Sequence, residues 1–345
     1  AGFVFTDDAP SVTASGTAAA TLTVDESDLA TNASASFANV FTVNYGADGA
    51  GSTAYALNVV NAASGLIDTA TGQAVTMSVD ASGNIVGKNT NGDTEFTISV
   101  SASGVVTLDQ ARAVQHADGT NANDTVALAA NSISLTATAT DKDGDSASQT
   151  VNLGAGFVFT DDAPTVTATA GNAATLTVDE TTLATNASAS FANVFTVNYG
   201  ADGAGSTAYA LAVVNAASGL VDTATGQAVS MSVDASGNVV GKNTNGDTVF
   251  TISVSSAGVV TLDQARAVMH ADGSNANDTV ALAANSISLT ATATDKDGDK
   301  ATQTVNLGAG FVFTDDAPTV TATASNVTTL TVDETTLATN ASASF

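Results

Sequence analysis

Short segments in which apolar and polar residues alternate recur along the whole chain. Residues 132–140 read Ser-Ile-Ser-Leu-Thr-Ala-Thr-Ala-Thr, and residues 146–153 resume the pattern after a turn that contains glycine. A period of two residues predicts a half-buried β-strand, and glycine allows the turn between two strands to close. The two segments therefore predict a β-hairpin, and its turn carries Asp141, Asp143 and Asp145.

Further strands follow at the spacing of about 8–12 residues that is typical of all-β sandwiches. In the first part of the chain they are expected at residues 11–15, 21–25, 37–45, 52–60, 75–79, 85–88, 94–100, 105–108 and 124–129. Residues 109–116 are expected to form one short helix, with Asp109 as its cap. The predicted fold is all-β, with tandem Ig-like or cadherin-like antiparallel β-sandwich domains, one short helix in each, arranged as an extended rod.

An internal repeat defines the domain organisation. The sequence Ala-Gly-Phe-Val-Phe-Thr-Asp-Asp-Ala-Pro occurs at residues 1–10, 155–164 and 309–318, with a period of 154 residues, the size of a whole domain. The predicted units are the end of a preceding repeat with its linker (1–9), complete repeats (10–162 and 163–316) and the truncated start of a third (317–345). That start lacks most of its strands, so it is not expected to fold alone, and the chain is expected to be a piece of a longer protein.

Near-identity between neighbouring copies favours spacer units over modules with separate binding tasks, because separate tasks would require different loops. The chain has 34 acidic and 7 basic residues, for a net charge of −27. This charge argues against nucleic acid and anionic membrane surfaces as partners and favours multivalent cations. No apolar run reaches the ~18 residues of a membrane span, so direct membrane insertion is not expected. With no cysteine, disulfide scaffolds and thiol chemistry are excluded.

The acidic residues gather where strands are expected to end. In an antiparallel sandwich of the immunoglobulin type, strand ends alternate between two poles, and the N-terminal pole faces the preceding domain. The residues expected to meet at that pole are Asp7, Asp8, Asp25, Glu26, Asp141, Asp143 and Asp145 in the first repeat, and Asp161, Asp162, Asp179, Glu180, Asp295, Asp297 and Asp299 in the second. Their counterparts in the third are Asp315, Asp316, Asp333 and Glu334.

Such a pole is expected to bind Ca²⁺. Two carboxylates about 5 Å apart repel by roughly 3 kcal/mol at an effective dielectric constant near 20. Calcium removes this repulsion by accepting six to eight oxygen ligands. Bound calcium would lock the linker against both neighbouring repeats, which makes those repeats the expected partners. The alternative is that these residues are ordinary solvated turn residues. The glycine position excludes an EF-hand.

A second, weaker cluster of oxygen ligands lies in an Asn/Asp-rich loop. It comprises Asp118, Asn121, Asn123 and Asp124, and in the second repeat Asp272, Asn275, Asn277 and Asp278. This loop is expected at the C-terminal pole, facing the next domain, and a plain turn explains it equally well. Asp48 is assigned to a turn only.

Catalytic chemistry is not expected. His116 and His270 are the only histidines, and each is assigned a structural or capping role. Arg112 and Arg266 are expected to pair with a local carboxylate. One histidine per repeat cannot supply a Ser-His-Asp arrangement, so neither an enzyme nor a small-molecule substrate is predicted.

Several motifs have counterparts in a known family. They are Phe-Val-Phe-Thr-Asp-Asp-Ala-Pro, Leu-Thr-Val-Asp-Glu, Tyr-Gly-Ala-Asp-Gly-Ala-Gly-Ser, Val-Thr-Leu-Asp-Gln-Ala-Arg-Ala-Val and Ser-Leu-Thr-Ala-Thr-Ala-Thr-Asp-Lys-Asp-Gly-Asp. With them the whole chain resembles the long tandem repeats of giant RTX adhesins, which Gram-negative bacteria export by type I secretion.

The resemblance implies Ig-like extender domains and display on the bacterial surface by an outer-membrane anchor. It also implies calcium-rigidified linkers, at positions that match Asp7, Asp8, Asp141, Asp143 and Asp145. The expected function is a spacer that projects a distal ligand-binding region for attachment and biofilm formation. The alternative is that the repeats themselves bind glycans or proteins, although the chain has no tryptophan and only 5% aromatic residues.

Overall fold

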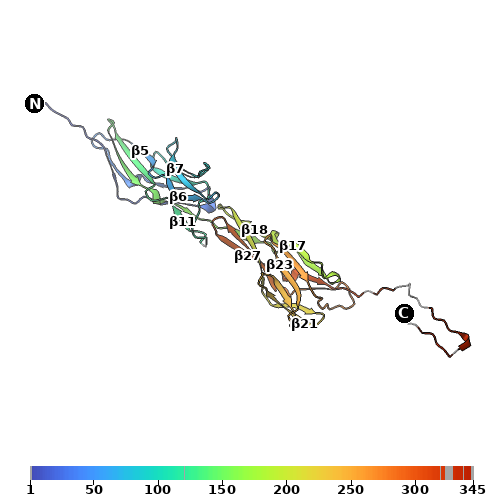
Figure 1. Cartoon of the computed structure of the whole chain (residues 1–345). Coiled ribbons are helices and arrows are strands. Elements are labelled where there is room, and N and C mark those ends of the chain that lie inside the picture. Colours follow the sequence, from blue (N-terminus) through green and yellow to red (C-terminus); the bar gives the residue numbers. More distant parts are fainter. Residues whose placement is uncertain (1, 120, 319, 323–328, 337, 343–345) are drawn as a thin grey trace.

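The computed structural model describes residues 2–119, 121–318, 320–322, 329–336 and 338–342. Two β-sandwich domains follow one another in a row, and the N-terminal segment extends away from the first of them (Figure 1). The predicted all-β class and the tandem, extended arrangement are confirmed. Among the described residues, no helix is long and apolar enough to cross a membrane.

The described residues of the first domain form fourteen strands. They are β1 (Ser11–Ala14), β2 (Leu22–Asp25), β3 (Ala33–Ser36), β4 (Phe41–Asn44), β5 (Ala50–Val59), β6 (Ala63–Asp68), β7 (Gln73–Val79), β8 (Ile85–Lys88), β9 (Thr94–Val100), β10 (Val105–Gln110), β11 (Thr125–Ala127), β12 (Ile133–Asp141), β13 (Ser146–Asn152) and β14 (Phe157–Thr160). Its short 3-10 helices are η1 (Glu26–Asp28), η2 (Ala38–Val40) and η3 (Gly154–Gly156).

The second domain repeats this order. Its strands are β15 (Thr165–Ala168), β16 (Leu176–Asp179), β17 (Ala187–Ser190), β18 (Phe195–Asn198), β19 (Ala204–Val213), β20 (Ala217–Asp222), β21 (Gln227–Val233), β22 (Val239–Lys242), β23 (Thr248–Val254), β24 (Val259–Gln264), β25 (Thr279–Ala281), β26 (Ile287–Asp295), β27 (Lys300–Asn306) and β28 (Phe311–Thr314). Its 3-10 helices are η4 (Ala170–Asn172), η5 (Glu180–Thr182), η6 (Ala192–Val194) and η7 (Gly308–Gly310), and η9 (Glu334–Thr336) lies beyond it.

Each domain contains a long meander and smaller sheets. In the first domain the meander has the order β3-β10-β9-β8-β7-β6, and the smaller sheets are β1-β4, β11-β14-β2 and β13-β12-β5. All neighbours in this sheet are antiparallel: short turns join the strands from β6 to β10, and β3 pairs with β10 from a distant part of the chain. The predicted hairpin is present: β12 pairs with β13 from Ser134↔Asn152 to Thr140↔Ser146, which leaves residues 141–145 as the turn.

Among the described strands, one pair in each domain is parallel. β2 pairs with β14 in the register Leu22↔Phe157 to Asp25↔Thr160, and β16 pairs with β28 in the same way. The end of β2 therefore lies beside the end of β14, which leads into the linker at Asp161. This pairing places Asp25 and Glu26 at the C-terminal pole, so their predicted position at the N-terminal pole is wrong.

Separate hydrophobic cores fill the two domains. The first runs from Val12 to Phe159 and the second from Leu176 to Phe313. Within the first, the ring of Phe159 on β14 packs 5.5 Å from that of Phe96 on β9. The Phe-Val-Phe segment before each linker thus belongs to the core of the domain that precedes it. The domain boundaries at residues 162 and 316 stay predictions.

The predicted helix at residues 109–116 is absent. Asp109 and Gln110 continue β10, where they pair with Thr97 and Phe96 of β9, and Val114 forms an isolated bridge with Asp68. The composition of this stretch suits a helix, but pairing with β9 and burial of Val114 override the local preference.

The predicted pairing of the two arginines is seen, and it differs between the repeats. Arg112 donates to Asp68 Oδ1 (3.2 Å) and to Glu95 Oε2 (3.2 Å), whereas Arg266 donates both bonds to Asp222, because Val249 replaces the glutamate. Glu95 is buried, and burial, with the charge of Asp68 adding to it, raises its pKa to about 7.

The substitution Glu95→Val is expected to remove a pH dependence of the first repeat. A carboxyl whose pKa rises on folding stabilises the fold below its unfolded pKa, near 4.5, and loses that contribution as pH rises through about 7. At pH 8 the variant should be more stable by on the order of 1–3 kcal/mol, as expected when a buried ionised group gives way to an apolar side chain. Thermal unfolding between pH 5 and 9 measures this.

The reverse substitution, Val249→Glu, is the matched control. It is expected to give the second repeat the pH dependence that the first repeat has. An unchanged pH slope in the Glu95→Val variant would show that Glu95 is not the source.

Candidate metal centre

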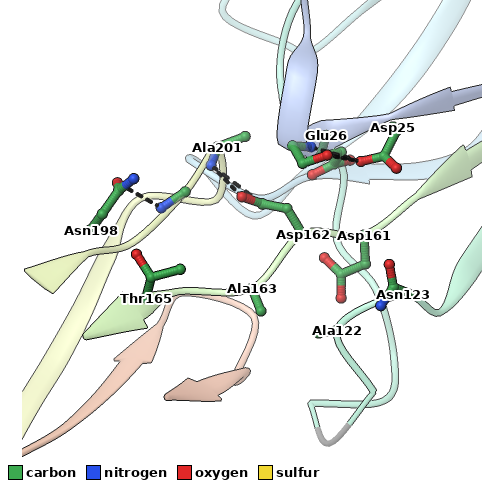
Figure 2. A pocket seen from close by; sticks show the side chains of 12 residues that line it. Asp25, Glu26, Ala122, Asn123, Asp161, Asp162, Ala163, Thr165, Asn198 and Ala201 are labelled. Carbon is green, nitrogen blue, oxygen red and sulfur yellow. Dashed lines mark hydrogen bonds between the residues drawn. The ribbon is translucent and has the colours of Figure 1, made fainter. Parts of the chain in front are cut away.

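Four buried carboxylates from three segments meet between the two domains. Glu26 comes from η1, Asp161 and Asp162 from the linker, and Asp202 from the loop between β18 and β19; one oxygen of each lies within 4.8 Å of the others. We call these four residues the junction cluster. It borders a cleft of about 540 Å³. Figure 2 shows Glu26 of the first domain across this cleft from Ala201 of the second, with Asp162 between them.

The end of β2 delivers Glu26 to the cluster. Asp25 Oδ1 accepts a hydrogen bond from Ser27 N (2.9 Å) and so caps η1, which turns the next side chain inward. Glu26 Oε1 accepts from Gln110 Nε2 (2.8 Å) and Val114 N (2.9 Å). One oxygen of Glu26 is thereby fixed, and the other, Oε2, is buried and accepts no hydrogen bond from a described residue.

The linker is held from both sides. Asp161 N donates to Asp124 O (3.0 Å) in the first domain, and Ala201 N of the second domain donates to the Asp162 carboxylate (3.2 and 3.3 Å). Gly200, at φ +71°, leaves the space that Asp162 occupies, and a Cβ there would clash with its carboxylate. The residues Gly-Ala-Asp-Gly therefore fold onto the linker and bring Asp202 to the cluster.

The hairpin between β26 and β27 also contacts the first domain. Asp295 Oδ1 accepts from Gly298 N (3.0 Å), which closes the turn. Across the junction, His116 N donates to Asp297 Oδ2 (3.3 Å) and Lys296 Nζ donates to Ala70 O (3.2 Å). After burial, the charges of the hairpin residues Asp297 and Asp299 raise the pKa of Asp161 in the linker, so hairpin and linker carboxylates influence one another here.

The electrostatics of the junction favour a cation. Burial raises the pKa of Glu26 to about 9, and the charge of Asp202 adds to the rise. Burial also raises the pKa of Asp161 and of Asp202, and the charge of Asp297 raises both further. Several buried oxygens accept no hydrogen bond from any described residue: Glu26 Oε2, Asp161 Oδ1, both Asp202 oxygens, Asp295 Oδ2, Asp297 Oδ1 and Asp299 Oδ2. Buried oxygens without donors are strongly unfavourable unless a cation or proton binds them.

Counterparts of these side chains form partial clusters, here called half-sites, at the two outer poles. At the N-terminal pole of the first domain, Asp7, Asp8 and Asp48 form one group, and Asp48, Asp141 and Asp143 form another. Asp8 accepts from Ala47 N (2.9 Å), as Asp162 does from Ala201 N. Asp7, Asp8, Asp143 and Asp145 are exposed, whereas their counterparts Asp161, Asp162 and Asp299 are buried and Asp297 is half-buried.

At the C-terminal pole of the second domain the other half recurs. Glu180, His270 and Asp315 form a group, and Glu180 Oε1 accepts from Gln264 Nε2 (2.8 Å) and Val268 N (2.8 Å), as Glu26 does from its counterparts. Asp179 caps η5 through Thr181 N (2.9 Å). Asp316, Asp333 and Glu334 are exposed. A complete cluster therefore combines a C-terminal pole, a linker and the next N-terminal pole.

The Asn/Asp-rich loops are internally bonded turns that end beside the linkers, since Asp161 N donates to Asp124 O and Asp315 N to Asp278 O. Asp118 N donates to Asp124 Oδ2 (3.1 Å) and Asn123 N to Asn121 Oδ1 (3.4 Å). In the second repeat Asp272 N donates to Asp278 Oδ2 (3.0 Å), and Asn277 N to Asn275 Oδ1 (3.1 Å). After burial, the charges of Asp297, Asp124 and Asp118 raise the pKa of Asp299, so the first loop faces the junction. A ligand role for these loops stays a prediction.

Sequence analysis missed two contributors. Asp202, with its counterpart Asp48, looked like a turn residue, and the available signal was its place in the repeated Gly-Ala-Asp-Gly. His116 was assigned a structural role, and the structure places its buried ring beside Asp161, with Nδ1 3.4 Å from Asp161 Oδ1. Glu26, His116 and Asp161 form a second group of candidate ligands.

Comparison with known proteins gives one family match. The family model described as a domain of unknown function (DUF5801) matches residues 21–154 and 175–308. Among curated proteins, none matches the chain in sequence.

Solved structures give weak likenesses. The chain is similar to the protocadherin gammaB7 EC3-6 cis-dimer structure (15% identity over 76% of this chain and 51% of that one, TM-score 0.22). It is also similar to a tetra-tandem repeat in the extending region of a large adhesion protein (17%, 83% and 55%, TM-score 0.16). A third likeness is to a Ca²⁺-stabilized adhesin that helps an Antarctic bacterium reach out and bind ice (17%, 89% and 99%, TM-score 0.09). The chain spans about half the length of the protocadherin fragments it matches, and TM-scores this low carry no argument about function.

Proposed function

Because the chain belongs to the DUF5801 family and carries two copies of its domain in tandem, we propose that these repeats are calcium-rigidified spacers of a large secreted bacterial surface adhesin. The spacers would hold a distal ligand-binding region away from the cell for attachment and biofilm formation. Type I secretion and an outer-membrane anchor belong to the same proposal, since they follow from the resemblance to giant RTX adhesins. The partners of each repeat are its neighbours and calcium, and no catalytic role is proposed.

The observation that carries this proposal is the junction cluster. Its four carboxylates are buried, supply only oxygen ligands and come from both domains and the linker between them. Calcium accepts six to eight oxygens at about 2.3–2.6 Å in flexible geometry, which suits such a set. A cation held by Glu26, Asp161 and Asp202 would contact all three segments that form the junction cluster. Its binding energy would therefore oppose bending between the domains.

The proposed ligands at the complete junction are Glu26, Asp161, Asp162, Asp202, Asp295, Asp297 and Asp299. Corresponding half-sites are Asp7, Asp8, Asp48, Asp141, Asp143 and Asp145 at one end, and Glu180, Asp315 and Asp316 at the other. Asp25 and Asp179 are proposed to act mainly as caps, because their carboxylates are used by Ser27 N and Thr181 N. The residues that line the junction cleft include no aromatic side chain, which gives no support to glycan binding there.

Small-angle scattering with a melting curve on residues 1–345 tests the proposal. Extracellular calcium modules bind at about 0.1–1 mM, so the chain is measured in EDTA, in millimolar Mg²⁺ and in millimolar Ca²⁺. Calcium is expected to lengthen and stiffen the particle and to raise the melting temperature, and magnesium is not, because it requires tighter octahedral geometry. The proposal would be overturned if neither the shape of the particle nor its melting temperature changed with calcium.

A further inference from the structure

We propose that Glu26, His116 and Asp161 form a nitrogen-containing metal site at the junction, which takes a borderline first-row divalent cation such as Zn²⁺. This inference deepens the proposed function and rests on it in part, because Glu26 and Asp161 also belong to the junction cluster. It differs in the class of metal. Oxygen ligands suit calcium, whereas imidazole suits zinc and its neighbours in the first transition row.

The imidazole of His116 is held in the tautomer that a metal requires. Its ring is buried, and Nε2 lies 3.2 Å from Phe159 O. A carbonyl oxygen can only accept, so Nε2 carries the proton and donates. In the neutral ring, Nδ1 is then an unprotonated acceptor. Metal-binding histidines almost always donate their second N–H to a carbonyl or carboxylate in this way, which fixes the orientation of the ring.

The acceptor nitrogen faces another acceptor. His116 Nδ1 lies 3.4 Å from Asp161 Oδ1, and neither atom has a hydrogen-bond partner among the residues that the structure describes. Glu26 Oε2, also without a described partner, belongs to a side chain that is 2% exposed. Lone pairs turned toward one another in a buried site repel, and a shared cation converts this repulsion into binding.

The spacing of the three ligand atoms suits a small cation. They all lie within 4.8 Å of one another. A tetrahedral Zn²⁺ site with bonds of about 2.0–2.2 Å places its ligands about 3.3 Å apart. The observed 3.4 Å between Nδ1 and the Asp161 oxygen already matches that separation. One neutral imidazole and two carboxylates balance the charge of one divalent cation.

The second repeat carries the same three residue types at the same positions. Glu180, His270 and Asp315 form a group, His270 Nε2 lies 3.5 Å from Glu180 Oε1, and neither ring nitrogen of His270 has a described hydrogen-bond partner. This group is more exposed than the first. The chain is therefore expected to hold one tight site at the junction and one weaker site at the C-terminal pole.

Cobalt titration of the whole chain tests the proposal, because Co²⁺ substitutes for Zn²⁺ and absorbs in the visible range. The titration is run in millimolar Ca²⁺, followed by displacement with Zn²⁺, and compared with the His116→Gln variant. Glutamine can keep the donor to Phe159 O and offers oxygen in place of nitrogen. The variant is expected to lose the tight cobalt site, with affinity reduced at least ~10-fold, and to keep the calcium response. The matched variant His270→Gln should lose only the weaker site.

Two results would contradict the proposed nitrogen site. Cobalt binding that is the same in the wild type and the His116→Gln variant would overturn the nitrogen site. So would a His116 ¹⁵Nδ1 resonance that Zn²⁺ leaves unmoved, as expected if the ring is protonated and only ion-paired with Asp161. Either outcome leaves the calcium proposal intact if calcium still stiffens the chain. Loss of the calcium response in the wild type would instead contradict the proposed function.

Discussion

Replacing Asp202 by asparagine is expected to raise the stability of the chain without calcium and to weaken its response to calcium. Both Asp202 oxygens are buried without a described donor, and burial raises the pKa of this carboxyl. In EDTA the folded wild type must either bury the charge of Asp202 or take up a proton there, and the neutral amide avoids both costs, so the variant should melt higher than the wild type. In calcium a ligand is missing, and the calcium concentration at half-response should rise by at least the roughly 10–100-fold that loss of an outer-shell partner costs. Melting curves across a calcium titration measure both effects.

Asp48→Asn is the matched control for this substitution. Asp48 occupies the same position in the first repeat, at the N-terminal pole where its neighbours Asp7 and Asp8 are exposed. Within residues 1–345 this half-site has no described domain in front of it, so the variant should keep the calcium-induced stiffening of the junction. If the two variants respond alike, the calcium effect does not arise at the junction cluster.

Replacing Phe159 by alanine is expected to destabilise the first domain by about 3–5 kcal/mol. Its ring is fully buried and packs against Phe96, so the substitution removes apolar burial and leaves a cavity. For a domain of this size, that loss lowers the melting temperature by roughly 6–20 °C. Hydrogen exchange should localise the loss to the sheet formed by β11, β14 and β2, while the second domain keeps its protection.

Phe5→Ala provides the control within the same chain. Phe5 occupies the position of Phe159 in the preceding copy of the motif, and it is 94% exposed. Its replacement should leave the melting temperature of both domains unchanged. A strong effect at Phe159 with none at Phe5 would support the predicted boundary after residue 162. Equal effects, or none at either position, would contradict the assignment of β14 to the first domain.

What could be predicted from the sequence depended on local pattern and on the repeat. The alternation in residues 132–140 identified β12 because it reports which side chains face a core, and the hairpin turn followed from its glycine. Covalent connection then placed the linker carboxylates Asp161 and Asp162 at the start of the second domain. The association of the hairpin with the linker followed from these two facts alone.

The position of Glu26 could not be predicted in this way. Alternation shows that residues 21–25 form a strand, but it does not show which strand is the partner. The partner, β14, lies more than 130 residues away in the sequence and runs parallel, so Glu26 reaches the opposite pole. Glu26 was expected beside the linker that precedes its own domain, and it lies beside the linker that follows that domain.

Asp202 and His116 were missed for different reasons. The composition of Gly-Ala-Asp-Gly predicts a turn. Asp202 reaches the junction cluster only because the neighbouring Ala201 N donates to Asp162, which is distant in the sequence. The stretch that contains His116 has the residue preferences of a helix. Tertiary contacts override them, since Glu26 accepts from Val114 N and β9 pairs with Asp109 and Gln110.

The parallel pair of β2 and β14 has a mechanical consequence. β14 leads directly into the linker, so tension along the row of domains pulls this strand along its own axis. Its hydrogen bonds to β2 and β11 run across that axis, and the load falls on all of them together, in shear, instead of opening them one at a time. A cation shared by Glu26 after β2 and Asp161 after β14 would tie the two strands at the end where the force enters. The unfolding force of each domain, measured by single-molecule pulling, is therefore expected to rise with the cation occupancy of the junction behind it.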